Sequence, residues 1–213
     1  MFEGNDEIEV MVIEININGI KIRLINAYGP QEKQKVDMKQ KFWDQLNHEV
    51  SSAENLSCGI ILQMDDNLRA GPSVIPGDPN PQNNNGKLFA NFLENHSNLS
   101  VVNALAKCKG LITRRRETVN GVEEAVLDYF VVCDRILPFV NWMVIDEKQE
   151  NCLTNYCTRN KMKKAFDSDH FTLSMELSLQ FHKSKHERVE HFNFRNKECQ
   201  DEFKKMTTQY NLC

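Results

Sequence analysis

Hydrophobic and polar residues alternate in two runs near the start of the chain, residues 8 to 17 and 20 to 28. A period of two is typical of a β-strand with one buried face. The runs are joined by Asn18-Gly19, a dipeptide that accepts the positive φ angles of a type I′ turn. The pattern therefore predicts a β-hairpin.

Two later segments, residues 37 to 52 and 86 to 97, have the spacing of amphipathic helices. Large apolar side chains recur about one helical turn apart in each segment, so they lie on one face. They are Met38, Phe42, Leu46 and Val50 in the first segment, and Leu88, Phe89, Phe92 and Leu93 in the second. We expect the first stripe to be part of the core.

Short apolar or alternating runs predict further strands. They span residues 58 to 64, 99 to 103, 125 to 133, 141 to 146 and 171 to 179. Residues 71 to 86 are rich in proline and asparagine, a composition that predicts an irregular loop. Helices between strands, several of them in antiparallel order, predict an α/β sandwich of the α+β class rather than a parallel doubly wound sheet.

The length of 213 residues and the hydrophobic content of 40% suit one large domain, which we place at residues 8 to 181. Residues 182 to 213 contain few large apolar side chains and are predicted to be a polar extension with a helix at about 194 to 209. The seven cysteines are irregularly spaced without a Cys-x-x-Cys pair, which indicates reduced thiols.

The net charge of −4 gives no overall attraction to a polyanion. Any binding to DNA must come from local basic clusters, and Arg114, Arg115 and Arg116 form one of them. No window approaches the roughly 18 apolar residues of a membrane helix, and the first residues are acidic. We therefore expect an intracellular protein without membrane contact, in the nucleus or the cytoplasm.

Three polar clusters stand at the ends of predicted strands. They are Asp65-Asp66-Asn67, Leu127-Asp128-Tyr129 and Ser168-Asp169-His170. A single aspartate in such a place is more often a turn or cap residue. Together, however, the clusters supply what a metal-assisted phosphodiesterase needs: carboxylates for a hard cation, an amide for a phosphate oxygen and an oriented histidine.

Five motifs follow one another in an order that resembles a known family. They are Asn26-Ala27-Tyr28-Gly29-Pro30-Gln31, Leu62-Gln63-Met64-Asp65-Asp66-Asn67, Leu111-Ile112-Thr113-Arg114-Arg115-Arg116, Asp128-Tyr129-Phe130-Val131-Val132 and Ser168-Asp169-His170. This order is similar to that of the endonuclease/exonuclease/phosphatase domain, of the apurinic-type endonuclease kind, in non-LTR retrotransposons. The resemblance covers residues 8 to 181.

The resemblance implies a four-layer α/β sandwich and a Mg²⁺-dependent or Mn²⁺-dependent endonuclease that nicks DNA to prime reverse transcription. A reverse transcriptase domain is then expected in the full-length element. Two alternatives stay open: a remnant without catalysis that serves as a binding module, and a phosphatase relative acting on small phosphate esters. The run from Thr113 to Arg116 and the context of Tyr28 to Gln31 favour the retroelement branch.

By the same resemblance, Tyr28 contacts the scissile phosphate. Asp65 orients or deprotonates the attacking water, and Asn67 binds a phosphate oxygen. Asp128 orients the catalytic histidine.

That histidine is His170, which the resemblance implies donates to the phosphate as negative charge develops. Asp169 is implied to lie near the metal ion or the leaving group. The hydroxyls of Thr113 and Ser168 are implied to support this network.

The chain departs from the family pattern in two places. Met64 and Asp66 stand where many relatives have Gly before the first aspartate and Phe or Ala after it. In the family, a glutamate that is the principal Mg²⁺ ligand lies well before the first hairpin, whereas only residues 1 to 7 precede it here. We therefore expect that ligand and the first strands to be missing, with marginal stability, aggregation or dependence on a partner as the result.

Overall fold

The structure is a computed structural model that describes residues 9–65, 67–148, 155–159, 162–166 and 168–179. The predicted extension at 182 to 213, with its helix, lies outside the described residues, as does Asp66. Within the described residues, no helix is both long and apolar enough to cross a membrane.

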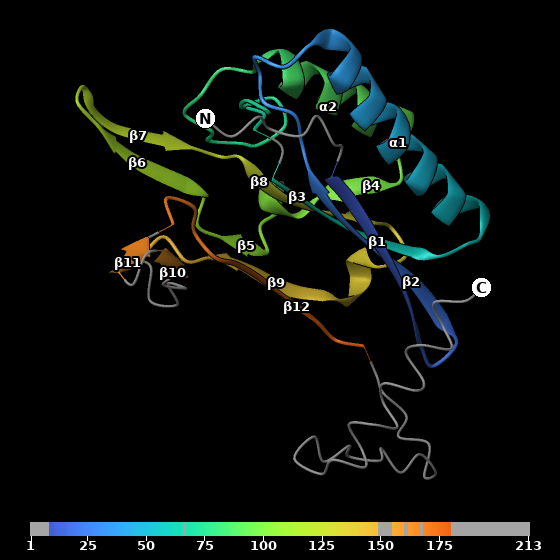
Figure 1. The fold of residues 1–213 in the computed structure, drawn as a ribbon. Coiled ribbons are helices and arrows are strands. Elements are labelled where there is room, and N and C mark those ends of the chain that lie inside the picture. Colours follow the sequence, from blue (N-terminus) through green and yellow to red (C-terminus); the bar gives the residue numbers. More distant parts are fainter. Residues whose placement is uncertain (1–8, 66, 149–154, 160–161, 167, 180–213) are drawn as a thin grey trace, which may run out of the picture. The chain divides into compact units, whose positions relative to one another are not determined.

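A five-stranded mixed sheet is the centre of the fold, with the strand order β1-β2-β3-β8-β4 (Figure 1). Its strands are β1 (Glu9–Ile17), β2 (Ile20–Tyr28), β3 (Gly59–Asp65), β4 (Leu99–Val101) and β8 (Asp128–Cys133). The predicted hairpin is confirmed: β1 and β2 are antiparallel, and Asn18 and Gly19 have φ angles of 52° and 83°. β2 and β3 are parallel, while β8 is antiparallel to both β3 and β4.

Both predicted helices form, α1 at Val36–Asn55 and α2 at Asn84–Asn95, and they cover one face of this sheet (Figure 1). Aromatic side chains join them, because the Trp43 ring on α1 lies 5.5 Å from the Phe92 ring on α2. The helix α2 begins two residues before its predicted start because Asn83 caps it, its side chain accepting the Gly86 N–H at 2.8 Å.

A three-stranded sheet, ordered β12-β9-β5, lies across the central sheet from the helices (Figure 1). It consists of β5 (Cys108–Lys109), β9 (Val140–Ile145) and β12 (Leu173–Leu177). The described residues thus form a sandwich of one helical layer and two sheets, which confirms the α+β class. No helix among the described residues covers the outer face of the three-stranded sheet.

Two hairpins were not predicted as such. β6 (Arg114–Thr118) pairs with β7 (Gly121–Ala125), and β10 (Asn155–Arg159) pairs with β11 (Met162–Phe166). The expected single strand from 125 to 133 is therefore wrong in its first part, where Ala125 ends β7 and Asp128 begins β8. The prediction failed because most of β6 and β7 is exposed, so neither strand shows the alternation that burial of one face produces.

Short 3₁₀ turns, at Val102–Ala104 and Leu137–Phe139, complete the regular structure. The first of them shortens the strand expected at residues 99 to 103, which ends as β4 at Val101.

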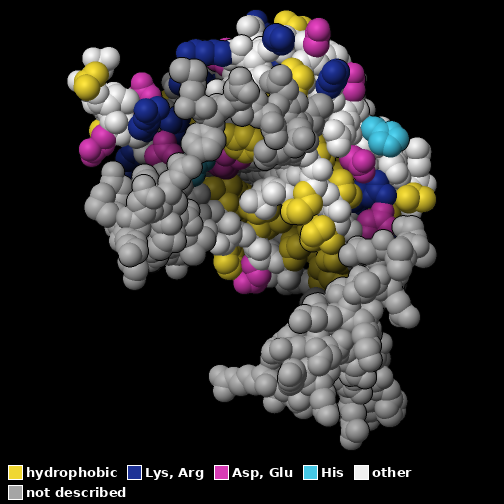
Figure 2. Space-filling model, viewed as in Figure 1, with side chains coloured by type: hydrophobic (Ala, Val, Ile, Leu, Met, Phe, Trp, Pro, Cys, Tyr) yellow, Lys and Arg dark blue, Asp and Glu magenta, His cyan; other side chains and the backbone are white. Residues whose placement is uncertain are grey.

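The strand β1 is an edge of the central sheet in the described part of the chain, and it exposes apolar side chains. Met11 and Ile13 are 55% and 47% exposed. Figure 2 shows hydrophobic side chains at the surface on the face that carries β1 and β2. An apolar row beside a free strand edge favours self-association. The expected marginal stability and aggregation remain predictions.

Replacing Tyr129 by phenylalanine is expected to lower the free energy of unfolding by about 1–3 kcal/mol. Tyr129 on β8 is fully buried, and its hydroxyl donates to the Val126 carbonyl at 2.6 Å and accepts from the Ala70 N–H at 3.3 Å. The change leaves both backbone groups short of a partner. Chemical denaturation checks this, with Tyr28→Phe at a half-exposed position as the control; equal stability of the two variants would contradict the prediction.

Candidate active site

Three of the expected site residues stand in one row across the central sheet. The strand register pairs Tyr28 on β2 with Asp65 on β3, and Asp65 with Asp128 on β8. Paired residues on neighbouring strands project to the same face of a sheet. The register thus places the three side chains side by side on the face opposite the helices.

His170 reaches this row through backbone pairing with the start of β6. Arg114 and His170 form an isolated antiparallel bridge. On either side of it, the Arg115 N–H donates to the Asp169 carbonyl at 2.8 Å, and the Phe171 N–H donates to the Thr113 carbonyl at 2.7 Å. The segment before β12 is thereby fixed next to Asp128.

The buried hydroxyl of Thr113 links this segment to Asp128. Its oxygen accepts hydrogen bonds from the backbone N–H groups of Leu127 and Asp128, at 2.8 and 3.1 Å. Ser168 has a smaller part, since its hydroxyl accepts the His170 N–H at 3.1 Å. The structure therefore brings both expected supporting hydroxyls into the network.

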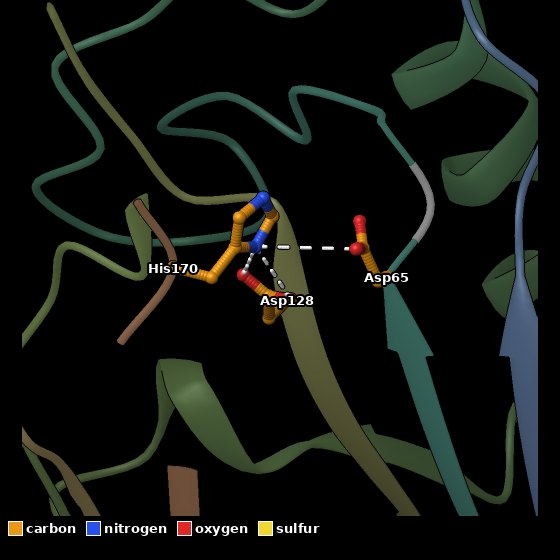
Figure 3. Close-up of side chains that lie close together, drawn as sticks. All are labelled: Asp65, Asp128 and His170. Carbon is orange, nitrogen blue, oxygen red and sulfur yellow. Dashed lines mark hydrogen bonds and ion pairs between the residues drawn. The ribbon is translucent and has the colours of Figure 1, made fainter. Parts of the chain in front are cut away.

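The centre of the site is a cluster of Asp65, Asp128 and His170 (Figure 3). His170 Nδ1 lies 3.0 Å from Asp128 Oδ2 and 3.9 Å from Asp65 Oδ2. An ionised carboxylate can only accept, so Nδ1 carries the hydrogen in its bond to Asp128. The other ring nitrogen, Nε2, is left for a substrate.

The close spacing of these groups shifts their protonation. Burial raises the pKa of the Asp65 carboxyl, and the Asp128 charge raises it further, against smaller opposing effects of His170, the Asn67 N–H and Arg114. The hydrogen bond to Asp128 raises the pKa of His170, although burial works against it. Asp65 is thus a stronger base than an ordinary aspartate. His170 keeps its proton, as an imidazolium, to a higher pH than an ordinary histidine.

The cluster fits a divalent cation. One ligand atom from each of Asp65, Asp128 and His170 lies within 4.8 Å of the others. Oδ1 of Asp65 is buried and has no hydrogen-bond partner, so it is an acceptor that a cation would satisfy. Two carboxylates are the oxygen ligands that Mg²⁺ and Mn²⁺ favour.

Asn67 and Tyr28 flank the cluster. Asn67 has a φ angle of 46°, a left-handed conformation that asparagine tolerates better than most residues, and its amide donates to the Gly29 carbonyl at 3.3 Å. The Gly29 N–H in turn donates to the Asp65 carbonyl at 2.8 Å. These bonds tie the loop after Tyr28 to the loop after Asp65, and the Tyr28 side chain remains 46% exposed.

Asp169 lies outside the three-residue cluster and is paired with Arg114. Arg114 Nε donates to Asp169 Oδ2 at 2.8 Å. Burial by itself would raise the pKa of the Asp169 carboxyl, but this hydrogen bond and the charges of Arg114 and His170 outweigh it and lower the pKa. The metal role expected of Asp169 remains a prediction.

The three arginines expected to meet DNA have different surroundings. Arg114 is bound to Asp169, and Arg115 is paired with Glu124 at 2.8 Å. Arg116 is exposed and has no ion pair with any described residue. Contacts with DNA remain a prediction for all three.

Two buried asparagines that support the site were missed from the sequence. The Asn103 amide donates to the Asp128 carbonyl at 3.0 Å and accepts the Phe130 N–H at 2.9 Å, so it continues the pairing of β8 beyond β4. The Asn85 amide donates to the Pro30 carbonyl at 2.9 Å. No local signal separates such residues from ordinary turn or cap asparagines.

Solved structures of nucleases have the same fold. One is the endonuclease domain of TRAS1, a telomere-specific non-LTR retrotransposon, with a TM-score of 0.54 and 16% identity over 80% of this chain and 64% of that one. Another is the 3′-5′ exonuclease NExo from Neisseria meningitidis, with a TM-score of 0.54 and 14% identity over 78% and 64%. A third is an AP endonuclease from Archaeoglobus fulgidus, with a TM-score of 0.52 and 17% identity over 79% and 65%.

These likenesses confirm the expected fold of the endonuclease/exonuclease/phosphatase type. The chain spans slightly less than two thirds of the length of each of these three structures. No protein-family model and no curated protein sequence matches the chain.

Thr113→Val is expected to lower the free energy of unfolding by about 1–3 kcal/mol, because it keeps the shape but leaves the buried Leu127 and Asp128 N–H groups without an acceptor. Thr113→Ser retains the oxygen and is the matched control. Urea denaturation compares them, and a valine variant as stable as the serine variant would show that Thr113 does not hold this part of the site.

The raised pKa of His170 predicts a pH dependence of stability. A histidine whose folded-state pKa exceeds its ordinary value of 6.5 stabilises the fold fully below pH 6.5, and this contribution is lost as pH rises through the raised pKa. Asp128→Asn removes the main cause, so the pKa of His170 should fall and this pH dependence should shrink. NMR titration of the imidazole and thermal unfolding at several pH values measure both. The exposed His48 on α1 is the reference histidine, and an unchanged His170 titration in Asp128→Asn would refute the assignment.

Proposed function

We propose that the chain is the metal-dependent, phosphodiesterase-type DNA endonuclease domain of a retroelement. The observation that carries this proposal is the cluster of Asp65, Asp128 and His170, in which an imidazole lies 3.0 Å from one carboxylate and 3.9 Å from a second. The fold shared with three nucleases supports it. The sequence motifs that surround the cluster point to the same chemistry.

Each residue of the site has a separate role in the proposed hydrolysis. Asp65, whose pKa is raised, accepts a proton from the water that attacks the phosphorus atom. Asp128 holds His170 by Nδ1, so that Nε2 donates to a phosphate oxygen as its negative charge increases. Tyr28 and Asn67, on either side of Asp65, hold the scissile phosphate.

Asp65, through its buried Oδ1, and Asp128 would hold the Mg²⁺ or Mn²⁺ ion, and Asp169 would lie near it or the leaving group. The bound ion would polarise the phosphate and offset the charge of the carboxylates. Ser168 and Thr113 act only through the residues that they hold in place.

DNA is the proposed substrate, and its backbone would run past the β6–β7 hairpin. Arg116 is exposed there and free of ion pairs within the described residues, so it offers a charge to a DNA phosphate. With a formal net charge of −4 on the whole chain, such binding is local and weakens with salt. A reverse transcriptase domain in the same element is the proposed partner.

We also propose that the activity is impaired. The only group of three or more possible metal ligands in the described part of the chain has two carboxylates and one imidazole, and no glutamate joins it. A Mg²⁺ ion prefers six oxygen ligands in regular geometry. The same observation favours the second candidate, a binding module without catalysis.

Nicking of supercoiled plasmid in the presence of Mg²⁺ tests the function. Asp65→Ala and His170→Ala should each lower the rate by about 10²–10⁴-fold, the usual contribution of a general acid or base. Matched controls are Asp44→Ala and His48→Ala, both exposed on α1 and away from the strand ends that form the site. EDTA should abolish nicking by the unchanged protein.

Two results would contradict the endonuclease. If the unchanged protein nicks DNA no faster than Asp65→Ala and His170→Ala but still binds duplex DNA, the inactive binding module is supported. Hydrolysis of p-nitrophenyl phosphate without nicking would support a phosphatase.

A further inference from the structure

Arg114 offsets part of the negative charge of the site. Three carboxylates, Asp65, Asp128 and Asp169, influence one another or share His170 as a neighbour. His170 and Arg114 are the two cations that act on them. Even with both protonated, the group carries one net negative charge, which would repel the phosphodiester that it is proposed to cleave.

The backbone places Arg114 beside His170. The two residues form an antiparallel bridge, and bridged residues project to the same face. The Arg114 side chain is 24% exposed, so most of it is withdrawn from solvent next to the cluster. Its charge also acts on Asp65.

Asp169 fixes the guanidinium and leaves its terminal nitrogens available. The hydrogen bond to Asp169 uses Nε. Neither Nη1 nor Nη2 of Arg114 makes a hydrogen bond to another described residue. A guanidinium held at one edge presents its remaining donors in a fixed plane, an arrangement that suits two phosphate oxygens.

The neighbouring arginines lack these features. Arg115 is paired with Glu124, and its guanidinium lies 5.3 Å from the centre of the Phe171 ring. Arg116 is exposed on the hairpin and lies opposite Glu123 in the β6–β7 register. Of the three, Arg114 alone has a side-chain hydrogen bond to the described segment that carries His170.

We propose that Arg114 is a catalytic residue, whose Nη groups bind the non-bridging oxygens of the scissile phosphate, and that Asp169 is the residue that positions it. This inference rests on the proposed function and deepens it, because it separates Arg114 from the arginines that contact the DNA backbone. Its charge stabilises the phosphate most when negative charge accumulates during attack. Asp169→Asn should reproduce part of the effect of Arg114→Ala.

The test compares Arg114→Ala with Arg116→Ala and Arg135→Ala. Arg135 follows β8 at the opposite end of the central sheet, where it binds the Ser57 carbonyl, and serves as the inert control. Single-turnover nicking and the affinity for a fluorescent DNA duplex are measured for each variant. Arg114→Ala should nick about 10²–10³-fold more slowly with less than about a threefold change in affinity. Arg116→Ala should weaken affinity more than it slows single-turnover nicking.

Chemical rescue makes the test specific. Guanidinium chloride at concentrations that do not unfold the protein should restore nicking by Arg114→Ala, while sodium chloride at equal ionic strength should not. Two results would overturn the assignment. One is a loss of DNA affinity in Arg114→Ala as large as its loss of nicking rate. The other is a nicking rate in Arg114→Ala equal to that of the protein without substitutions.

The binding of inorganic phosphate separates this inference from the nuclease proposal. If the unchanged protein does not nick DNA, the nuclease proposal fails and calorimetric titration with phosphate decides the role of Arg114. Phosphate binding that is lost in Arg114→Ala and kept in Arg135→Ala would support Arg114 as the phosphate-binding residue. Equal binding by both variants, or none by the unchanged protein, would overturn it.

Discussion

The hydrogen-bonded register of β2, β3 and β8 is the constraint on which the rest of the site depends. It aligns Tyr28, Asp65 and Asp128 across three neighbouring strands. Because side chains alternate between the faces of a strand, a shift of one residue would turn a strand's functional side chain toward the helices. The packing of α1 and α2 on one face therefore also fixes which face carries the chemistry.

A second set of polar contacts brings the last strand to this row. Thr113 is its central residue, since its hydroxyl accepts two N–H groups at the start of β8 and its carbonyl accepts the Phe171 N–H. These bonds lie in a buried region, where an unpaired donor is costly. The same contacts that stabilise the sandwich thus hold His170 against Asp128, and the fold and the site share their supports.

The site concentrates charge in a protein whose overall charge is modest. Asp169 is balanced by Arg114, whereas Asp65 has a buried carboxylate oxygen without a partner. The Asp169 carboxylate therefore has its partner within the chain, whereas a cation could still bind the Asp65 oxygen. The surroundings of Asp65 and Asp169 thus differ, although both aspartates lie close to His170.

Features with a local cause could be predicted from the order of the residues. Asn18-Gly19 specified the hairpin, the apolar stripes specified α1 and α2, and the polar residues after apolar runs marked where chemistry would lie. The meeting of Asp65, Asp128 and His170 became visible only in the folded chain. The same holds for the bond between Arg114 and Asp169 and for the pairing of Asn103 with β8. The tertiary structure also decided that the charged run at Arg114 is a strand. The meeting of Asp65, Asp128 and His170 depends on pairing between distant segments, which leaves no periodic pattern in the residues that it joins. The β6–β7 hairpin is local, but its exposed strands bury no face and so show no alternation.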